Sequence, residues 1–212
     1  MKKIAGTIIL LTSMASFSAY AADPASNEAA AQTQSNNVSS SSDKITLGSF
    51  YQGGVIYWLD PEKSYKHGLI ADINDAPNSL KAGYSWDTNP PSKTNATNDN
   101  DYAGKIDTTT IIKAIGTTRA QAANACATST NQGYSDWYLP SMQELSHLFE
   151  MKTTIEKAAK AESGQTLGNS PYWSATEYHL NSAWTVSSMG GSFHANTTNK
   201  RHTLSVRCVR AF

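Results

Sequence analysis

The sequence predicts an α+β domain with antiparallel strands and two to three helices. Three observations support this prediction: strand-like segments come first, segments with helical spacing occupy the middle, and strand-like segments close the chain. Elements that are segregated along the chain in this order favour an α+β fold. No repeat of fixed period is visible.

The N-terminus has the three parts of a secretory signal peptide. Lys2 and Lys3 supply the charged part, residues 4–14 the apolar part, and residues 19–21 a small-x-small cleavage site. The apolar part is shorter than the roughly 20 residues that a membrane-spanning helix needs. We therefore predict a signal peptide over residues 1–21 and a soluble protein that is secreted, periplasmic or at the cell surface.

Two further segments follow the predicted signal peptide. Residues 22–43 are rich in Ala, Ser, Asn and Gln and contain no aromatic residue. Such a segment buries too little apolar surface to offset the entropy lost on ordering, so we expect a disordered tether. Residues 44–212 have the length of one domain with one core.

The first elements of the domain are predicted to be strands. An apolar run over residues 54–59 is bounded by Gly and by Asp-Pro, and a second strand is expected over residues 67–73. Residues 81–107 are dense in Asn, Asp, Thr, Gly and Pro, which is typical of a loop. A short helix is expected over residues 107–115.

Two capping boxes mark the later helices. Thr118 and Gln121 have the spacing of a box that opens an Ala-rich helix containing Cys126. Ser141 and Glu144 form a second box, and four apolar residues follow Ser141 at helical spacing. Helical propensity continues for about twenty residues, until a glycine interrupts it. The rest of the chain is strand-like, over residues 172–175, 183–188, 192–196 and 203–210, with a Gly-Gly turn at 190–191.

The two cysteines, Cys126 and Cys208, predict one disulfide. In an oxidising compartment an even pair of cysteines is typical of a bridge, whereas the alternative is two buried free thiols. In the chain-entropy model, closing so long a loop stabilises a domain by roughly 4.5 kcal/mol.

The sequence predicts no metal, no cofactor and no enzymatic activity. The five histidines never fall at a compact ligand spacing, and residues 98–101 lack the Gly and terminal Glu of an EF-hand, so a solvated turn is preferred over a calcium site. No catalytic motif with a known mechanism is present. Asp136, Glu144 and Glu177 form an alternative set of paired carboxylates, but Glu144 is better explained as a helix cap.

Tryptophans in strands and motif turns are expected in the core, because each ring is a large apolar group with one polar handle. These are Trp58, Trp137, Trp173 and Trp184. Trp86 lies in a polar loop instead, where it either stacks on a sugar ring or pins the loop, and the sequence leaves both alternatives open.

Charge is distributed unevenly although the chain carries 17 basic and 17 acidic residues. No Asp or Glu follows Glu177, while that segment contains Lys200, Arg201, Arg207 and Arg210 together with His179, His194 and His202. Such a segment attracts polyanions. We expect Lys200, Arg201 and His202 in an exposed polar loop over residues 196–202, where they either contact a ligand or serve only solubility. Arg207 and Arg210 either contact the ligand too or form salt bridges with acids of the first strands.

Three short signatures carry a resemblance to a known family. They are residues 133–140 (GYSDWYLP), 172–177 (YWSATE) and 206–210 (VRCVR). Together they resemble the C-terminal domain family of the Legionella collagen-like adhesin, over roughly residues 50–212. The resemblance implies a C-type-lectin-like fold in which residues 55–59 pair near residues 204–210. It also implies the bridge between Cys126 and Cys208.

The resemblance implies an exported, non-enzymatic adhesin that binds an anionic polysaccharide such as a sulfated glycosaminoglycan, on a host or other surface. No nucleic-acid partner is expected. It implies a homotrimer as well, but no heptad or collagen repeat enforces one, so the oligomeric state stays open. One alternative is a structural or protein-binding module of the envelope. The other is an enzyme of the formylglycine-generating type, which would need reactive cysteines.

Overall fold

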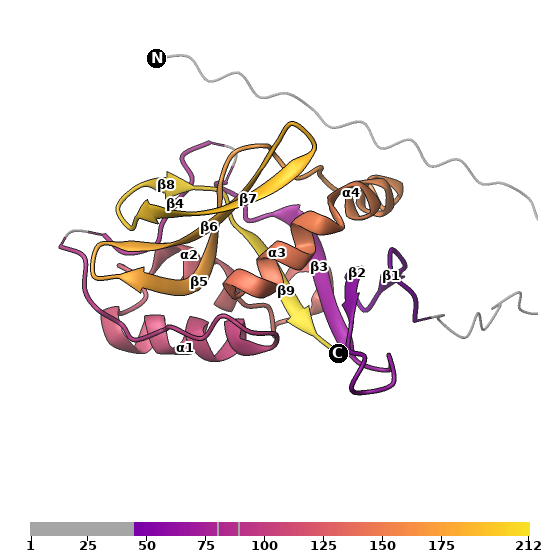
Figure 1. Ribbon diagram of the computed structural model, residues 1–212, viewed down its shortest axis with the longest axis horizontal. Coiled ribbons are helices and arrows are strands. Elements are labelled where there is room, and N and C mark those ends of the chain that lie inside the picture. The colour runs from indigo at the N-terminus through magenta and orange to yellow at the C-terminus, as the bar shows by residue number, and fades with distance from the viewer. Residues whose placement is uncertain (1–44, 80, 89) are drawn as a thin grey trace, which may run out of the picture. The chain divides into compact units, whose positions relative to one another are not determined.

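The computed structural model describes residues 45–212 except residues 80 and 89. The predicted signal peptide over residues 1–21 and the predicted tether over residues 22–43 lie outside these residues. In the described part, helices pack against three antiparallel sheets (Figure 1). The prediction of a mixed fold with antiparallel strands is therefore confirmed.

A four-stranded sheet forms the centre of the domain. Its order is β1 (Phe50–Tyr51), β2 (Gly54–Leu59), β3 (Gly68–Asp75) and β9 (Arg207–Ala211). The expected strands are confirmed, but the expected pairing of the first long strand with the last is wrong. The connection over residues 60–67 folds β3 back onto β2, because strands that follow one another in sequence are usually neighbours in the sheet. β9 therefore pairs with the free edge of β3.

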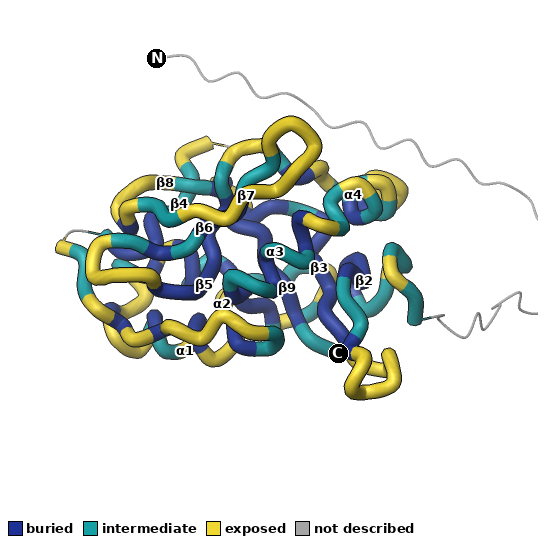
Figure 2. The backbone as a smooth tube through the Cα atoms, in the orientation of Figure 1, coloured by how far each residue is buried: buried dark blue, intermediate teal, exposed yellow. Residues whose placement is uncertain are grey.

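Two smaller sheets complete the strand arrangement. β4 (Tyr84–Ser85) pairs with β8 (Thr203–Leu204), and β5 (Tyr172–His179), β6 (Ser182–Met189) and β7 (Ser192–Asn199) form a meander. Gly190 and Gly191 have φ of 60° and 85°, the left-handed values that a tight hairpin turn requires. β7 forms the exposed edge of the meander (Figure 2).

Four α-helices lie in the described residues. They are α1 (Ala103–Ile115), α2 (Gln121–Ala127), α3 (Met142–Glu150) and α4 (Lys152–Ala161), with a 3-10 turn at Asn131–Gly133. The predicted box at Ser141 is confirmed, because Ser141 accepts from the Glu144 amide and Glu144 accepts from the Ser141 amide. The box predicted at Thr118 is wrong. α2 begins at Gln121 after Ala120, which has no side-chain cap, and Thr118 lies in the preceding turn.

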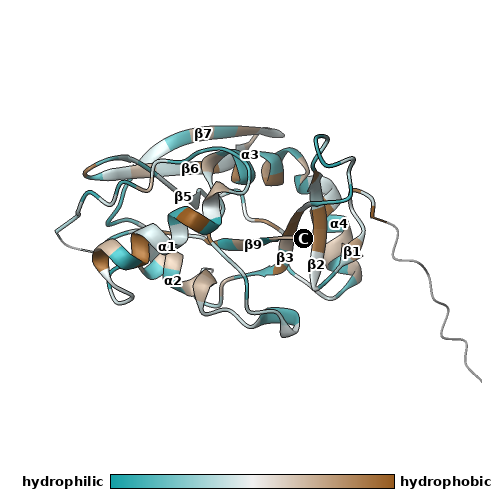
Figure 3. Ribbon diagram, turned by 90° about the horizontal axis from the view of Figure 1, so that it is seen from below, coloured by the Kyte–Doolittle hydropathy of each residue, from teal (hydrophilic) through white to brown (hydrophobic). Residues whose placement is uncertain are grey.

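Side chains of the central sheet alternate between two hydrophobic clusters. Val55 and Leu69 pack with α3 and α4, whereas Ile56 and Ile70 pack with α1 and α2. Successive side chains of a strand point to opposite faces, so a strand covered on both faces is apolar along its length. Figure 3 shows apolar residues along β2 and β3.

The core prediction is confirmed for two of the four tryptophans. Trp137 and Trp173 are buried in the cluster that contains α1 and α2. Trp58 and Trp184 are only half-buried.

A disulfide joins Cys126 of α2 to Cys208 of β9, as predicted. The two cysteines are 82 residues apart in sequence, and their Cα atoms are 5.4 Å apart. Both are buried in the cluster that α1 and α2 share with the sheet. The bridge therefore holds α2 against the last strand.

Replacing both cysteines with alanine should lower the free energy of unfolding by about 4 kcal/mol, because a loop of this length gains conformational entropy in the unfolded chain. Urea denaturation measures this difference. Reductant should destabilise the natural protein and leave the double variant unchanged. Equal unfolding midpoints for the oxidised protein and the double variant would show that the bridge contributes nothing.

Candidate binding site

Lys200 is fully buried, which corrects the expectation of an exposed loop over residues 196–202. β7 continues to Asn199, and the turn after it is held by backbone hydrogen bonds. The Lys200 amide donates to Asn181 O (2.9 Å), and its carbonyl accepts from the amides of Trp86 (2.9 Å) and Asp87 (3.1 Å). These bonds direct the side chain into the domain.

The Lys200 ammonium has three partners inside the domain. It forms an ion pair with the buried carboxylate of Glu177, donates to Ser92 O (2.8 Å) and lies 4.4 Å from the centroid of the Trp86 ring. Burial lowers the pKa of Lys200, and the hydrogen bond to Glu177 opposes that shift. The ion pair is therefore a structural contact and not a ligand contact.

Glu177 fixes the loop that precedes α1. Its carboxylate oxygens accept from the amides of Thr94 (2.8 Å) and Asn95 (2.9 Å) in addition to the Lys200 ammonium. Trp86 is buried, and its indole Nε1 donates to Ser174 O (2.8 Å). The sequence left open whether Trp86 stacks on a sugar ring or holds its loop in place. Its burial and this hydrogen bond show that it holds the loop.

Arg207 and Arg210 are also engaged in structural ion pairs. Arg207 is fully buried and its Nε donates to Asp75 Oδ1 (2.7 Å) in β3, as the salt-bridge alternative predicted. Arg210 makes a two-pronged contact with Asp136 (2.7 and 2.9 Å) and lies over the Tyr134 ring at 4.1 Å. Partial burial of Asp136 acts to raise the pKa of its carboxyl group. The hydrogen bond and positive charge of Arg210 outweigh this effect and hold that pKa below its usual value. Asp136 lies outside the first strands, so that part of the expectation was wrong.

Arg201 and His202 are exposed in the turn that follows β7, the cationic turn. The Arg201 amide donates to Asn199 Oδ1 (3.0 Å), and the Arg201 carbonyl accepts from Ser85 Oγ (3.3 Å). Of the six predicted ligand residues, these two are at the surface, while the other four are buried.

A cleft of about 700 Å³, the polar cleft, lies between α2 and the segment leading into β4. Its described lining includes the polar side chains of Asn78, Tyr84, Thr117, Gln121, Asn124, Thr128, Ser129, Thr130 and Asn131, and no charged side chain. Amides and hydroxyls both donate and accept hydrogen bonds, as sugar hydroxyls do. The cleft is thus suited to an uncharged, hydroxyl-rich part of a ligand.

Sequence reasoning missed the polar cleft because it searched for charge and motifs. One signal was present: Gln121, Asn124 and Thr128 occur at i, i+3 and i+7, which places them on one face of α2. Ala122, Ala123 and Cys126 occupy the buried face. The polar side of α2, opposite its buried alanines, therefore forms one wall of the cleft.

Ser85 connects the polar cleft to the cationic turn. Its amide donates to Gln121 Oε1 (3.1 Å) in the cleft wall, and its hydroxyl donates to Arg201 O (3.3 Å) in the turn. Tyr84, beside it in β4, also lines the cleft and pairs with Leu204. One two-residue strand therefore positions both surfaces.

The candidate catalytic carboxylate Glu144 is fully buried. Its oxygens accept from the Tyr138 hydroxyl (2.9 Å) and the Ser141 amide (2.7 Å), and burial raises its pKa to about 7. The backbone of α1 closes over it, since a Cβ at Gly104 would lie 2.3 Å from Glu144 Oε2. Glu144 is a buried cap.

Neither a metal site nor a membrane-spanning helix occurs in the described residues. No group of three or more His, Cys, Asp or Glu side chains there is placed to hold a metal ion. Nor does that part of the chain contain a helix with the length and apolar character needed to span a bilayer.

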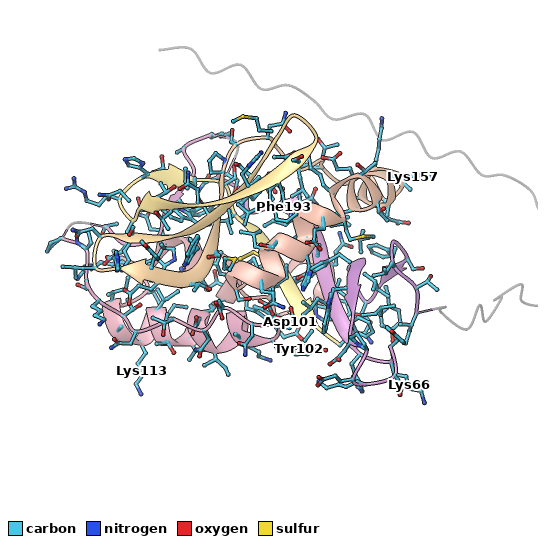
Figure 4. All side chains as sticks on the ribbon, in the orientation of Figure 1. Lys66, Asp101, Tyr102, Lys113, Lys157 and Phe193 are labelled. Atoms are coloured by element: carbon cyan, nitrogen blue, oxygen red, sulfur yellow. A yellow bond between two sulfur atoms is a disulfide. The ribbon has the colours of Figure 1, made fainter. Side chains whose placement is uncertain are left out.

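Lys200→Met should lower the free energy of unfolding by about 3–5 kcal/mol, because it leaves the Glu177 carboxylate buried without a counter-ion. Adding Glu177→Gln should restore part of the loss. Lys157→Met, at an exposed position of α4 (Figure 4), is the matched control and should change stability by less than about 0.5 kcal/mol. Urea denaturation provides the comparison, and equal effects of the two lysine substitutions would contradict the burial of Lys200.

Comparison with known proteins places the domain in a family. A solved structure, the crystal structure of a fimbrial protein from Bacteroides ovatus, matches with a TM-score of 0.52 and 16% sequence identity. The match covers 74% of this chain but only 43% of that chain, and it shows the fold alone. No curated protein matches the chain. The model of the Lcl C-terminal domain matches residues 77–210, more than half of the sequence, and the chain therefore belongs to the Lcl C-terminal domain family.

Proposed function

We propose that the chain is an exported, non-enzymatic module of the adhesin type that binds an anionic polysaccharide such as a sulfated glycosaminoglycan. Membership of the Lcl C-terminal domain family supports a surface or secreted role, and the fold shared with a fimbrial protein is consistent with it. In this proposal the domain is C-type-lectin-like and follows a signal peptide and a tether.

The connection through Ser85 is the observation that carries the proposed ligand class. A sulfated polysaccharide presents hydroxyl groups and anionic groups along one chain. The polar cleft offers amides and hydroxyls to the sugar hydroxyls, and the exposed cationic turn offers positive charge to the sulfate groups. Because Ser85 holds both surfaces, one oligosaccharide would contact them together.

A single copy of this site should bind weakly. Exposed ion pairs contribute about 0–1 kcal/mol each, and of the six predicted ligand residues Arg201 and His202 are at the surface. Strong adhesion then requires several copies that act on one polysaccharide, since linked sites gain avidity without new contacts. A homotrimer would provide this, and we include it in the proposal.

Arg201→Ala should lower the salt concentration at which the protein elutes from heparin, because it removes a cation that contacts sulfate. Lys113→Ala, which removes the same charge at the exposed end of α1 (Figure 4), is the matched control and should elute as the natural protein does. Asn124→Leu should weaken binding without changing the salt dependence, since it removes an uncharged contact of the cleft.

The outcomes of the heparin experiment separate the proposed functions. Equal shifts for Arg201→Ala and Lys113→Ala would mean that heparin responds to net charge, and the cationic turn would lose its assignment. Failure of the natural protein to bind heparin or neutral polysaccharide would favour the alternative of a structural or protein-binding module of the envelope.

A further inference from the structure

A second pocket, of about 640 Å³, shares no lining residue with the polar cleft. It lies between the turn that follows β2, the start of α1, and α3. Three ring-bearing and three acidic residues line it: Trp58, Tyr102, His147, Asp60, Glu62 and Asp101. We name it the acidic aromatic pocket. Neither the predicted ligand site nor the structural ion pairs described above account for it.

The rings of the acidic aromatic pocket are arranged around Trp58. The Tyr102 ring meets Trp58 edge-on at 5.6 Å, and the His147 ring stacks on it at 5.9 Å. Tyr102 has φ of 65°, a left-handed conformation that is rare for an aromatic residue. Backbone conformations of this kind persist where the surroundings impose them, often at ligand sites. Figure 4 shows Asp101 and Tyr102 next to each other at the start of α1.

The carboxylates of Asp60 and Asp101 in the pocket are held in place by polar contacts. Asp60 Oδ2 accepts from the Tyr102 hydroxyl (3.1 Å), and Asp60 Oδ1 accepts from the Glu62 amide (2.9 Å). Asp101 Oδ2 accepts from Gln143 Nε2 (3.3 Å), and Asp101 Oδ1 lies 3.3 Å from His147 Nε2. A cation in this position can form an ion pair with a carboxylate and a cation–π contact with the face of a ring.

A lysine of the chain itself occupies the edge of this arrangement. The Lys63 ammonium lies 4.2 Å from the centroid of the Tyr102 ring and 3.5 Å from Asp60 Oδ2. The Lys63 side chain is 51% exposed, and these two contacts are made by the ammonium group. An ammonium group of this chain therefore already lies against one ring and one carboxylate of the pocket.

We propose that the acidic aromatic pocket binds an organic ammonium group from outside the chain, and that Lys63 competes with it as a tethered occupant. The ammonium would come from a lysine side chain of a partner protein or from the amine of an amino sugar. In either case it would lie against the Tyr102 ring and beside Asp60, where the Lys63 ammonium now lies.

The test is a titration followed by NMR at the Trp58 indole N–H and the Tyr102 amide. The lysine probe is Nα-acetyl-lysine N-methylamide, and its uncharged match is the norleucine analogue. The sugar probe is glucosamine, and its uncharged match is N-acetylglucosamine. Each ammonium probe that binds should shift both signals, whereas its uncharged match should not. A response to only one ammonium probe identifies the source of the group.

The competition by Lys63 has its own matched pair of variants. Lys63→Met keeps the apolar chain and removes the charge, so it should tighten binding of the ammonium probe by about two- to fivefold. Lys66→Met removes the same charge from the same exposed turn (Figure 4) and should leave the affinity unchanged. Equal effects of the two variants would indicate a general charge effect and overturn the competition.

Two results would overturn the site itself. One is that the uncharged analogues shift Trp58 as strongly as the ammonium probes do. The other is that neither ammonium probe shifts the two signals in the natural protein or in Lys63→Met. The polysaccharide proposal is tested separately, because heparin elution of Lys63→Met should match that of Lys66→Met.

Discussion

The ion pair between Lys200 and Glu177 is the interaction on which the candidate binding surface depends. Burying two charges is costly unless further hydrogen bonds satisfy them. Here Glu177 also accepts from two loop amides, and Lys200 also donates to Ser92 O and lies over Trp86. Since these partners come from a segment without regular structure, the pair fastens that segment to β5. β4, the polar cleft and the cationic turn are positioned next to it.

The fold changes what the charge distribution of the sequence means. A C-terminal segment without acids predicts a basic surface, yet Lys200, Arg207 and Arg210 are buried and paired with acids from other parts of the chain. Their partners are Glu177, Asp75 and Asp136. The two arginine pairs hold β9 to β3 and to the GYSDWYLP motif, so two of the three signatures are in direct contact. What reaches the surface is a small cationic turn beside an uncharged cleft.

Local signals in the sequence predicted much of the fold, although the local box at Thr118 was wrong. The failures at the candidate binding site have another cause, which is long-range contacts. The Ser141 box, the Gly-Gly turn and the cysteine pair depend on neighbouring residues or on compartment chemistry, and the structure confirms all three. The burial of Lys200 depends on Glu177 and on a loop more than 100 residues away, which no local pattern encodes. The polar cleft was missed because its amides and hydroxyls come from three separate segments, and only the stripe on α2 was visible.

The most direct test of the shared site is an NMR titration of the isotope-labelled protein with a sulfated heparin tetrasaccharide. One ligand that contacts both surfaces should shift the side-chain amides of Gln121 and Asn124 together with the backbone amide of Arg201, all with one dissociation constant. The Lys200 amide, which faces the interior of the turn, should move less. Shifts confined to the exposed lysines of α1 and α4, with the cleft amides unchanged, would contradict the account.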